Sequence, residues 1–577
     1  MFNCQHLSKQ LTLTRISMVF AALVLPVLFA PFYADDFFHL LLLGESPLLQ
    51  RGGDGSLFGL FSFVDSDPAH RAQLLRYGVL PWWSSDTFVM RFWRPLAEAS
   101  HWLDYQLLPG VAWFAHLHSL LWFVLLAYVV YSLAKRREAD KTVLLLVLAL
   151  FLWDGQHLAT IHWIANRSAL ISAVLAFSAL FHQMCWREQG GAGHLLLALV
   201  LYLLALAASE MALSVLVYLF FYALLLDRQR AVAGLLHFIP YLLLSLGYLF
   251  FYHQAGFGAQ TSEAFYISPL HEPLRFLQIL PARFLAYSFA ALVPVPAGLA
   301  WVGGATHAWL GQGFLLLALL LVPLLLWCLK STFSDRRMAF WLLSGLLSCL
   351  PVCAAMPQDR LALYQTVGVD IYLAMFIGSC LRSDSLKNRL TRLLASGFIV
   401  LHLLLSPLYL LVGNWVMCQQ AADILYQALH FNGQSSLERK HLVVINMPLG
   451  LSVPLIGTRA AMGADIPLSF LPLASDEGHF TLRRINEREF TVQRDTGFVI
   501  GFEQQFTAQK DRHFTQGQVF FHPAAQVMVA AVNDAGLPAV LQISLAAPPA
   551  AYQFYVFRPA AGLQPLQLPD VGAAIHF

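Results

Sequence analysis

Acidic and basic side chains recur where the long apolar stretches of this 577-residue chain end. Ionisable groups that must lie near an apolar layer are costly to keep there, so they are functional candidates. Carboxylates in such places could accept a proton or bind a divalent metal ion, and arginines could hold a phosphate. The candidates are Asp35, Asp36, Arg94, Asp104, His116, His162, Arg167, Glu210 and Arg360.

Composition defines the elements that must position these residues. Hydrophobic residues make up 58% of the chain and charged residues 12%, against roughly 25% charged residues in an average soluble chain. These values exclude a soluble enzyme, a disordered protein and a collagen-like fibre, and they indicate a polytopic α-helical membrane protein. The net charge of +2 gives no reason to expect nucleic acid as a partner. The seven cysteines form no CxxC pair and show no metal-ligand spacing.

Eleven apolar segments are long enough to be membrane spans. They are centred on 16–33, 113–134, 142–160, 168–186, 194–208, 211–226, 234–252, 309–329, 338–355, 362–381 and 393–413. The stretch 276–300 is apolar but holds Arg283 and three prolines, and we expect it to be interfacial or re-entrant. Loops on one side hold 16 Lys and Arg in 55 residues, and loops on the other side hold 9 in 159. The positive-inside rule therefore predicts a cytoplasmic N-terminus and an outward C-terminal tail.

Three regions face outward in this topology: the loop 34–112, the loop 253–308 and the tail 421–577, which follows a membrane module over 1–420. All of the candidate residues lie on this outward side. The tail has short alternating runs at 442–445, 526–529 and 552–557, with a turn at 533–536, which predicts a β-rich domain. We expect this domain to fold on its own and to help position the acceptor or a partner, without taking part in catalysis.

The outer face also carries ordered motifs. Asp35-Asp36 opens the first loop, Phe92-Trp93-Arg94-Pro95-Leu96 and Leu103-Asp104-Tyr105 lie near its end, and His116-Leu117 follows. Downstream come Trp163–Leu170 with Arg167, Ser209-Glu210, and Asp359–Tyr364 with Arg360. In this order the chain resembles the GT-C glycosyltransferases over about 20–400, most closely the protein O-mannosyltransferase-like branch. It departs from that branch by one inserted residue beside Arg94 and by Ser119 in place of an asparagine.

The resemblance implies a sugar transferase that takes its donor from a polyprenyl-phosphate carrier on the outer side of the membrane. It assigns the role of catalytic base to Asp35, with Asp36 as second choice. It assigns binding of the donor phosphate to Arg94, Arg167 and Arg360. Asp104, His116, His162 and Glu210 remain further polar candidates. A divalent metal ion, if one is used, would be held by Asp35 and Asp36. Four outer tryptophans could stack on sugars or anchor the chain at the interface: Trp82, Trp83, Trp93 and Trp102.

Two other classes stay open. A transporter or flippase for lipid-linked sugar would place charges at the bilayer midplane and show inverted repeats, and neither is visible in the sequence. A non-catalytic scaffold would not need so many spans. The single N-glycosylation sequon, at Asn166, abuts a span. We therefore expect a bacterial inner membrane, an undecaprenyl-phosphate donor, and a glycan, lipid or protein acceptor.

Overall fold

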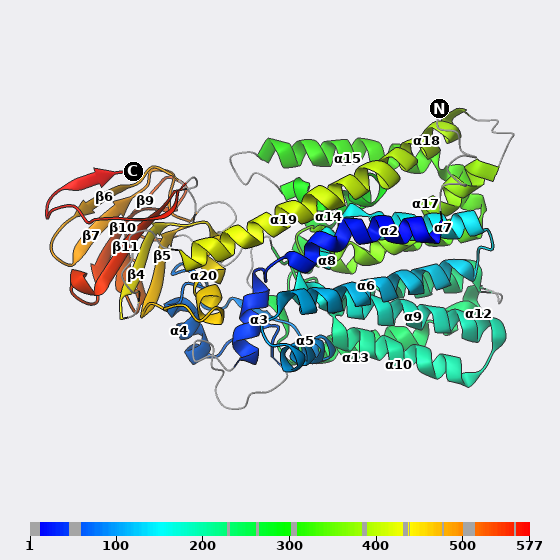
Figure 1. The fold of residues 1–577 in the computed structure, drawn as a ribbon, viewed down its shortest axis with the longest axis horizontal. Coiled ribbons are helices and arrows are strands. Elements are labelled where there is room, and N and C mark those ends of the chain that lie inside the picture. Colours follow the sequence, from blue (N-terminus) through cyan, green and yellow to red (C-terminus); the bar gives the residue numbers. More distant parts are fainter. Residues whose placement is uncertain are drawn as a thin grey trace.

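The computed structural model describes residues 12–44, 59–227, 231–260, 265–301, 308–382, 389–430, 437, 439–475, 478–499, 514–558 and 561–577. Helices form one elongated bundle, and a β-rich domain lies beyond one end of it (Figure 1). The first strand of that domain begins at His441, after the long helix α19 (Ser406–Leu429) has left the bundle.

Each of the eleven predicted spans coincides with an apolar helix or a bent pair. Among the described residues, seven helices are long and apolar enough to span a membrane, a bent pair forms an eighth candidate span, and three apolar helices are shorter. The spanning helices are Ala112–Lys135, Ile164–Gln189, Gly234–Gln254, Ala308–Cys328, Arg336–Ala354, Leu363–Arg382 and Arg389–Leu429, with the bent pair Lys141–Trp153 and Gly155–His162. The shorter ones are Leu13–Phe29, Ala192–Ala208 and Glu210–Leu226.

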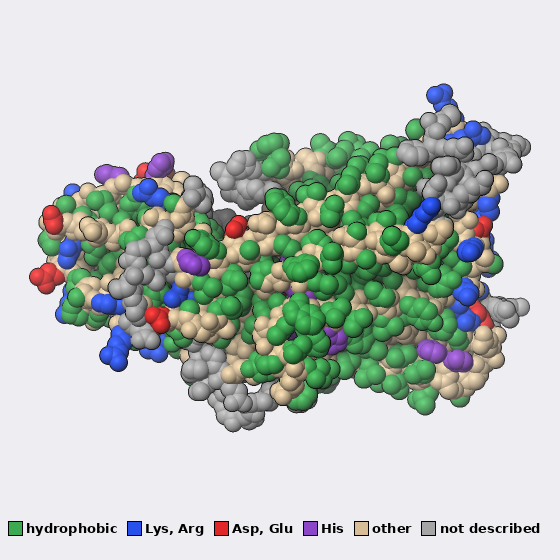
Figure 2. Space-filling model, in the orientation of Figure 1, with side chains coloured by type: hydrophobic (Ala, Val, Ile, Leu, Met, Phe, Trp, Pro, Cys, Tyr) green, Lys and Arg blue, Asp and Glu red, His purple; other side chains and the backbone are tan. Residues whose placement is uncertain are grey.

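The flank of the bundle matches this assignment. Figure 2 shows hydrophobic side chains over the flank and Lys and Arg gathered at the end away from the β-rich domain. Exposed apolar side chains such as Leu243, Phe250 and Leu320 need a hydrocarbon environment. Which end faces the cytoplasm stays a prediction.

The stretch 276–300 holds most of one helix, α14 (Pro273–Leu292), which packs against α15 (Ala308–Cys328). Its Arg283 is buried and donates to the carbonyl oxygens of Cys353 and Ala354 at 2.9 and 2.7 Å. These bonds to the chain following α16 (Arg336–Leu347) supply an enclosed arginine with acceptors.

Short elements lie between the β-rich domain and the near end of the bundle (Figure 1). They are α3 (Asp35–Leu43), α4 (Pro68–Arg76), α5 (Pro95–Leu107) and a small antiparallel sheet of β1 (Ser62–Val64), β2 (Val89–Arg91) and β3 (Gly258–Gln260). The sheet joins the first outer loop to the second, because β2 pairs with both β1 and β3.

The β-rich domain has two sheets. One is antiparallel, in the order β13-β6-β7-β10-β9-β8, and the other has the order β12-β11-β4-β5. The strands are β4 (His441–Asn446), β5 (Ser469–Ala474), β6 (Thr481–Arg484), β7 (Glu489–Gln493), β8 (Val519–His522), β9 (Ala525–Val532), β10 (Pro538–Leu545), β11 (Tyr552–Arg558), β12 (Gly562–Pro565) and β13 (Ala574–His576). The predicted runs at 442–445, 526–529 and 552–557 are strands β4, β9 and β11, and residues 533–536 connect β9 to β10.

The sequence did not reveal one helix of this domain. α20 (Leu449–Ala461) crosses between the parallel strands β4 and β5 and packs on α3 of the first loop. Its Gly450 and internal Pro454 weaken the sequence signal for a helix. The crossover explains why the four-stranded sheet is buried on both faces, as parallel strands usually are.

Two tryptophans of the first loop lie inside the domain rather than at the membrane interface or beside a sugar. Trp82 and Trp83 are 4% and 0% exposed and pack between the two sheets. The Trp82 indole donates to the Leu473 carbonyl at 3.1 Å. The expectation for these two residues is wrong because nonlocal packing encloses them. Trp93 packs on Tyr248 and Phe251 of α13 (Ile239–Gln254).

Candidate active site

A cavity of about 190 Å³ lies at the end of the bundle beside the β-rich domain, and its walls come from the loops 34–112 and 253–308 and from the turns near 163, 210 and 358. Four of the candidate residues line it: Asp35, Arg94, Glu210 and Arg360. The other lining residues are Phe61, Phe63, Met90, Phe92, Trp163, Ala165, Asn166, Phe265, Tyr266, Ala355, Met356, Gln358 and Leu361. Both acidic and basic groups therefore face one small volume with mostly apolar walls.

Asp35 is the carboxylate best placed to react. It begins α3 directly after Ala34, whose φ of 47° lies in the left-handed region that favours glycine. Within the described part of the chain, no group donates a hydrogen bond to its carboxylate. Burial raises the pKa of Asp35 to about 6, while the positive charges of Arg360 and Arg94 hold it down. The group is thus mostly ionised at pH 7 and more basic than an ordinary aspartate.

Asp36 has a different environment from its neighbour. Its Oδ2 accepts from the Tyr33 backbone N–H at 3.0 Å, and its Oδ1 accepts from the Ala165 N–H at 2.7 Å. Burial raises the pKa of Asp36 to about 7 against these two donors, which favour the ionised form. The bonds fasten the start of α3 to the turn before α9 (Arg167–Gln189). The arrangement fits a residue that positions Asp35.

Arg360 is the cation with unused donors. Its Nε donates to Gln358 Oε1 at 2.7 Å, and its guanidinium lies 4.8 Å from the centre of the Trp163 ring. Among the described residues, no acceptor takes a hydrogen bond from its two terminal amines. Those amines can bind two oxygens of a phosphate in the cavity.

Arg94 and Glu210 lie in the cavity wall as a pair. Arg94 Nε donates to Glu210 Oε2 at 3.1 Å, and Arg94 Nη2 donates to Oε1 at 2.5 Å. The guanidinium also lies 4.9 and 4.5 Å from the ring centres of Phe61 and Phe92. The Arg94 guanidinium adds positive charge near Asp35, but two of its three nitrogens already donate to Glu210, which limits its capacity to bind a ligand.

The structure does not bring Arg167 or Asp104 to the cavity. Arg167 is 0% exposed, and its Nη1 lies 2.5 Å from Asp104 Oδ2. Its remaining donors reach Ser119 Oγ at 2.9 Å and the Ala115 carbonyl at 2.7 Å. Asp104 Oδ1 also bonds His118 Nδ1 at 2.6 Å. This network ties α9 to α5 and α6 (Ala112–Lys135) and engages all three guanidinium nitrogens of Arg167 inside the protein.

The histidine candidates are enclosed elsewhere. His116 and His162 are each 0% exposed, with ring centres 5.8 Å apart. His162 Nε2 lies 3.5 Å from the Cys418 sulfur. Neither histidine lines the cavity.

An apolar groove of about 440 Å³ adjoins the cavity and shares Glu210, Tyr266, Ala355 and Leu361 with it. Its walls come from α13, from the chain after Glu210, and from the segment Pro351–Ala354. Leu242 and Leu246 line it and are 38% and 53% exposed on the bundle flank. The groove thus connects the polar cavity to the hydrocarbon layer.

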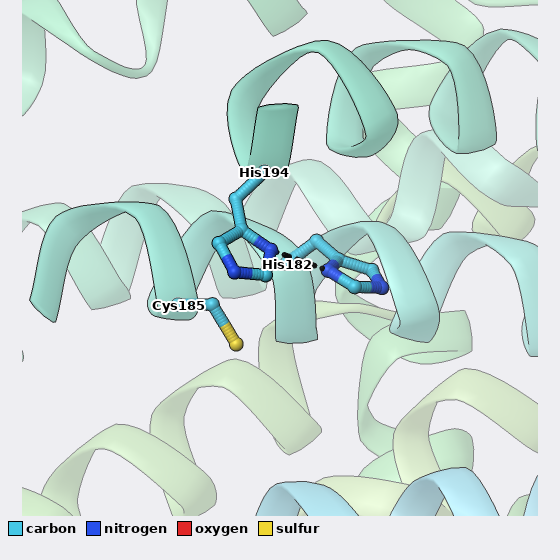
Figure 3. Close-up of side chains that lie close together, drawn as sticks. All are labelled: His182, Cys185 and His194. Atoms are coloured by element: carbon cyan, nitrogen blue, oxygen red, sulfur yellow. Dashed lines mark hydrogen bonds between the residues drawn. The ribbon is translucent and has the colours of Figure 1, made fainter. Parts of the chain in front are cut away.

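The donor set at Asp35 and Asp36 does not fit a divalent metal ion. Both Asp36 oxygens already accept backbone N–H groups, and the charged side chains nearest Asp35 are arginines. Among the described residues, a search for three clustered His, Cys, Asp or Glu ligands finds a group elsewhere: His182, Cys185 and His194 (Figure 3). His194 is sixteen residues before Glu210, about 24 Å along a helix, so this group is separate from the cavity.

Several lining residues were missed or undervalued by sequence reasoning. Trp163 belongs to the motif Trp163–Leu170, but the sequence assigned it no role in the site. Gln358 and Tyr266 were not predicted as site residues. Gln358 orients Arg360, and Tyr266 reaches the cavity through an isolated bridge to Ala355. Only the backbone path of the 253–308 loop could have indicated Tyr266.

These features define a multi-pass helical membrane protein with a C-terminal β-rich domain and a cavity at one end of the helical bundle that acidic and basic side chains line. No family model matches the chain, and no curated protein matches it. The solved structures that resemble it weakly include the following two. An oligosaccharyltransferase from Archaeoglobus fulgidus, crystallised with a tethered acceptor peptide, is 11% identical with a TM-score of 0.39, and the match covers 80% of this chain and 64% of that one. ArnT from Cupriavidus metallidurans is 12% identical with a TM-score of 0.38, covering 78% and 85%. TM-scores below 0.5 do not establish a common fold.

Proposed function

We propose that this protein is a membrane glycosyltransferase of GT-C type that moves a sugar from a polyprenyl-phosphate carrier to a hydroxyl acceptor. One observation carries the proposal. Asp35, whose carboxylate accepts no hydrogen bond from the described residues, and Arg360, whose terminal amines donate to none of them, face the same cavity, and an apolar groove leads from that cavity to the hydrocarbon layer.

The chemistry needs both groups. The acceptor oxygen attacks the anomeric carbon, its proton passes to Asp35, and the bond from that carbon to the phosphate oxygen breaks. The phosphate leaves with its electron pair on the oxygen, and Arg360 stabilises the added charge. Attack from the face opposite the leaving group gives inversion at the anomeric carbon. Proton acceptance by a placed base contributes about 10²–10⁴-fold in rate.

The groove supports a lipid-linked donor. A polyprenyl chain needs apolar walls with an opening to the bilayer, which the side chains of α13 provide. With its phosphate at Arg360, such a donor would hold its sugar beside Asp35. The same proposal puts the cavity on the outer face of a bacterial inner membrane, with undecaprenyl phosphate as carrier.

The test is transfer of radiolabelled sugar from polyprenyl phosphate by purified protein in vesicles that contain an envelope lipid extract. We expect Asp35→Asn to lose at least about 10²-fold in transfer rate and to keep its melting temperature and donor binding. Asp86→Asn, an exposed carboxylate of the same loop, is the matched control and should be unchanged. Wild-type turnover by Asp35→Asn would overturn the role of Asp35. Movement of the carrier across the membrane without a new glycosidic bond would favour a flippase.

A further inference from the structure

A second cavity, of about 260 Å³, adjoins Asp35 and lies outside the donor path described above. It shares Asp35, Phe63 and Met90 with the active-site cavity. Its walls come from α3 and α4, from Ile424 of α19, and from one face of α20. The carboxylate of Asp35 therefore belongs to two adjoining spaces of different character.

The walls of this second cavity are almost wholly apolar. Beside Asp35, the polar lining groups are the Gln73 amide and the Tyr33 and Tyr77 phenols. A peptide backbone or a sugar enclosed here would lose hydrogen bonds to water and find few in return, which costs about 1–3 kcal/mol per unsatisfied group. A hydrocarbon chain carries no such cost and gains from leaving water.

The C-terminal domain keeps this cavity open. α20 lines it with Gly450, Val453, Pro454 and Gly457, a spacing that puts all four on one face of a helix. A Cβ atom added at Gly450 would meet nothing within 4 Å, and one added at Gly457 would lie 3.4 Å from Leu41 Cδ1. Strands β4 and β5 fix the two ends of α20, so the domain sets the shape of this wall.

We propose that this cavity holds the hydrocarbon part of the acceptor, which is an amphiphile with its hydroxyl at Asp35, and that α20 selects it. The inference rests on the proposed transferase for its reaction, but the cavity's preference for an aliphatic chain is a separate property. The acceptor is then a membrane lipid rather than a soluble peptide or glycan. The C-terminal domain is part of the acceptor site.

The probe is a long-chain aliphatic alcohol with a photoreactive diazirine near its hydroxyl, applied to the full chain in lipid nanodiscs. Mass spectrometry locates the labelled peptides, and excess unlabelled decanol measures the saturable part. We expect competed labelling on α3 and α20. Gly450→Phe, which fills the cavity, should weaken it about tenfold or more, a loss of at least 1.4 kcal/mol. Met462→Phe, at the exposed end of α20, should leave it unchanged.

Gly457→Leu provides a second filling variant if Gly450→Phe has a lowered melting temperature. Labelling that persists in both variants, or that is absent from α3 and α20 in the wild type, overturns the proposal. Competition by a serine-containing hydrophilic peptide at the same concentration as decanol also overturns it. The outcome is independent of sugar transfer. Failed labelling with intact Asp35-dependent transfer refutes only the apolar acceptor, and competed labelling without transfer refutes only the transferase.

Discussion

At the scale of single residues, neighbouring carboxylates with similar sequence signals have different environments. Asp35 faces two cavities and receives no hydrogen bond from the described residues, whereas Asp36 accepts two backbone N–H groups. The sequence supplied the pair, and the structure separates a reacting group from a positioning one. Hydrogen bonds from the distant Ala165 cannot be read from the order of residues.

The raised pKa of Asp35 predicts an acid limb in the pH profile. Because Asp35 must be ionised to accept a proton, kcat/KM should fall about tenfold per pH unit below about pH 6. An ordinary aspartate would keep the enzyme active to about pH 4. The measurement is kcat/KM for sugar transfer between pH 4.5 and 8, with donor binding followed in parallel. A flat profile above pH 5 would contradict the role of Asp35.

Arg360, which is partly buried, and Arg167, which is fully buried, should respond in opposite ways to truncation. Arg360→Ala removes a partner for the donor phosphate, worth about 1.5–3 kcal/mol, and should leave the melting temperature nearly unchanged. Arg167→Ala leaves Asp104 without its buried cation, which costs roughly 3–5 kcal/mol of stability. Arg360→Ala should therefore weaken donor binding with little change in thermal unfolding, and Arg167→Ala should lower the melting temperature. Equal losses of stability in both variants would contradict this assignment.

At the scale of elements, regular periodicity was predictable and irregular connections were not. Apolar helices match all of the expected spans because hydropathy defines them, although three of these helices are shorter than a full span and one span is a bent pair. Strands β4, β9 and β11 followed from alternation and turn residues. Helix α20 did not, because a glycine and a proline interrupt its pattern. Arg94, Glu210 and Arg360 were predicted as site residues because they lie in ordered motifs on one side of the apolar segments, but Arg167 gave the same signal and is enclosed.

The start of α3 carries backbone strain that a glycine would relieve. Ala34 has φ 47° and ψ −112°, a conformation that costs a residue with a Cβ about 1–3 kcal/mol. Glycine loses more conformational entropy on folding than alanine, which costs about 0.5–1 kcal/mol. Because this cost is smaller than the strain that is relieved, Ala34→Gly should raise the free energy of unfolding. Ala97→Gly, in the ordinary helix α5, should lower it by about 1 kcal/mol. Thermal unfolding of both variants checks the contrast, and equal losses of stability would contradict the strain.

At the scale of the whole molecule, the topology makes a direct prediction. The excess of basic residues in one set of loops puts the N-terminus in the cytoplasm and the β-rich domain outside. A reporter that is active only in the cytoplasm should be silent when fused after Phe577 and active when fused within 383–388. Activity after Phe577 would reverse the side on which the cavity lies.

The packing of the first loop into the β-rich domain revises the expectation that the tail folds by itself. Trp82 and Trp83 fill the space between its sheets, and Leu74 and Leu80 cover the outer face of the four-stranded sheet. Removing one large core aromatic typically costs about 3–5 kcal/mol, which is a large part of the stability of a small domain.

Residues 430–577 expressed alone should therefore keep β-type circular dichroism but aggregate and bind a hydrophobic dye. Fusion of residues 59–91 to that segment through a flexible linker should restore a soluble species with a cooperative thermal transition. The same fusion with Trp82→Ala and Trp83→Ala is the matched control and should behave like the isolated tail. A soluble, cooperatively folding tail without the loop would show that the two sheets can close without the tryptophans, and that the loop docks on a finished domain.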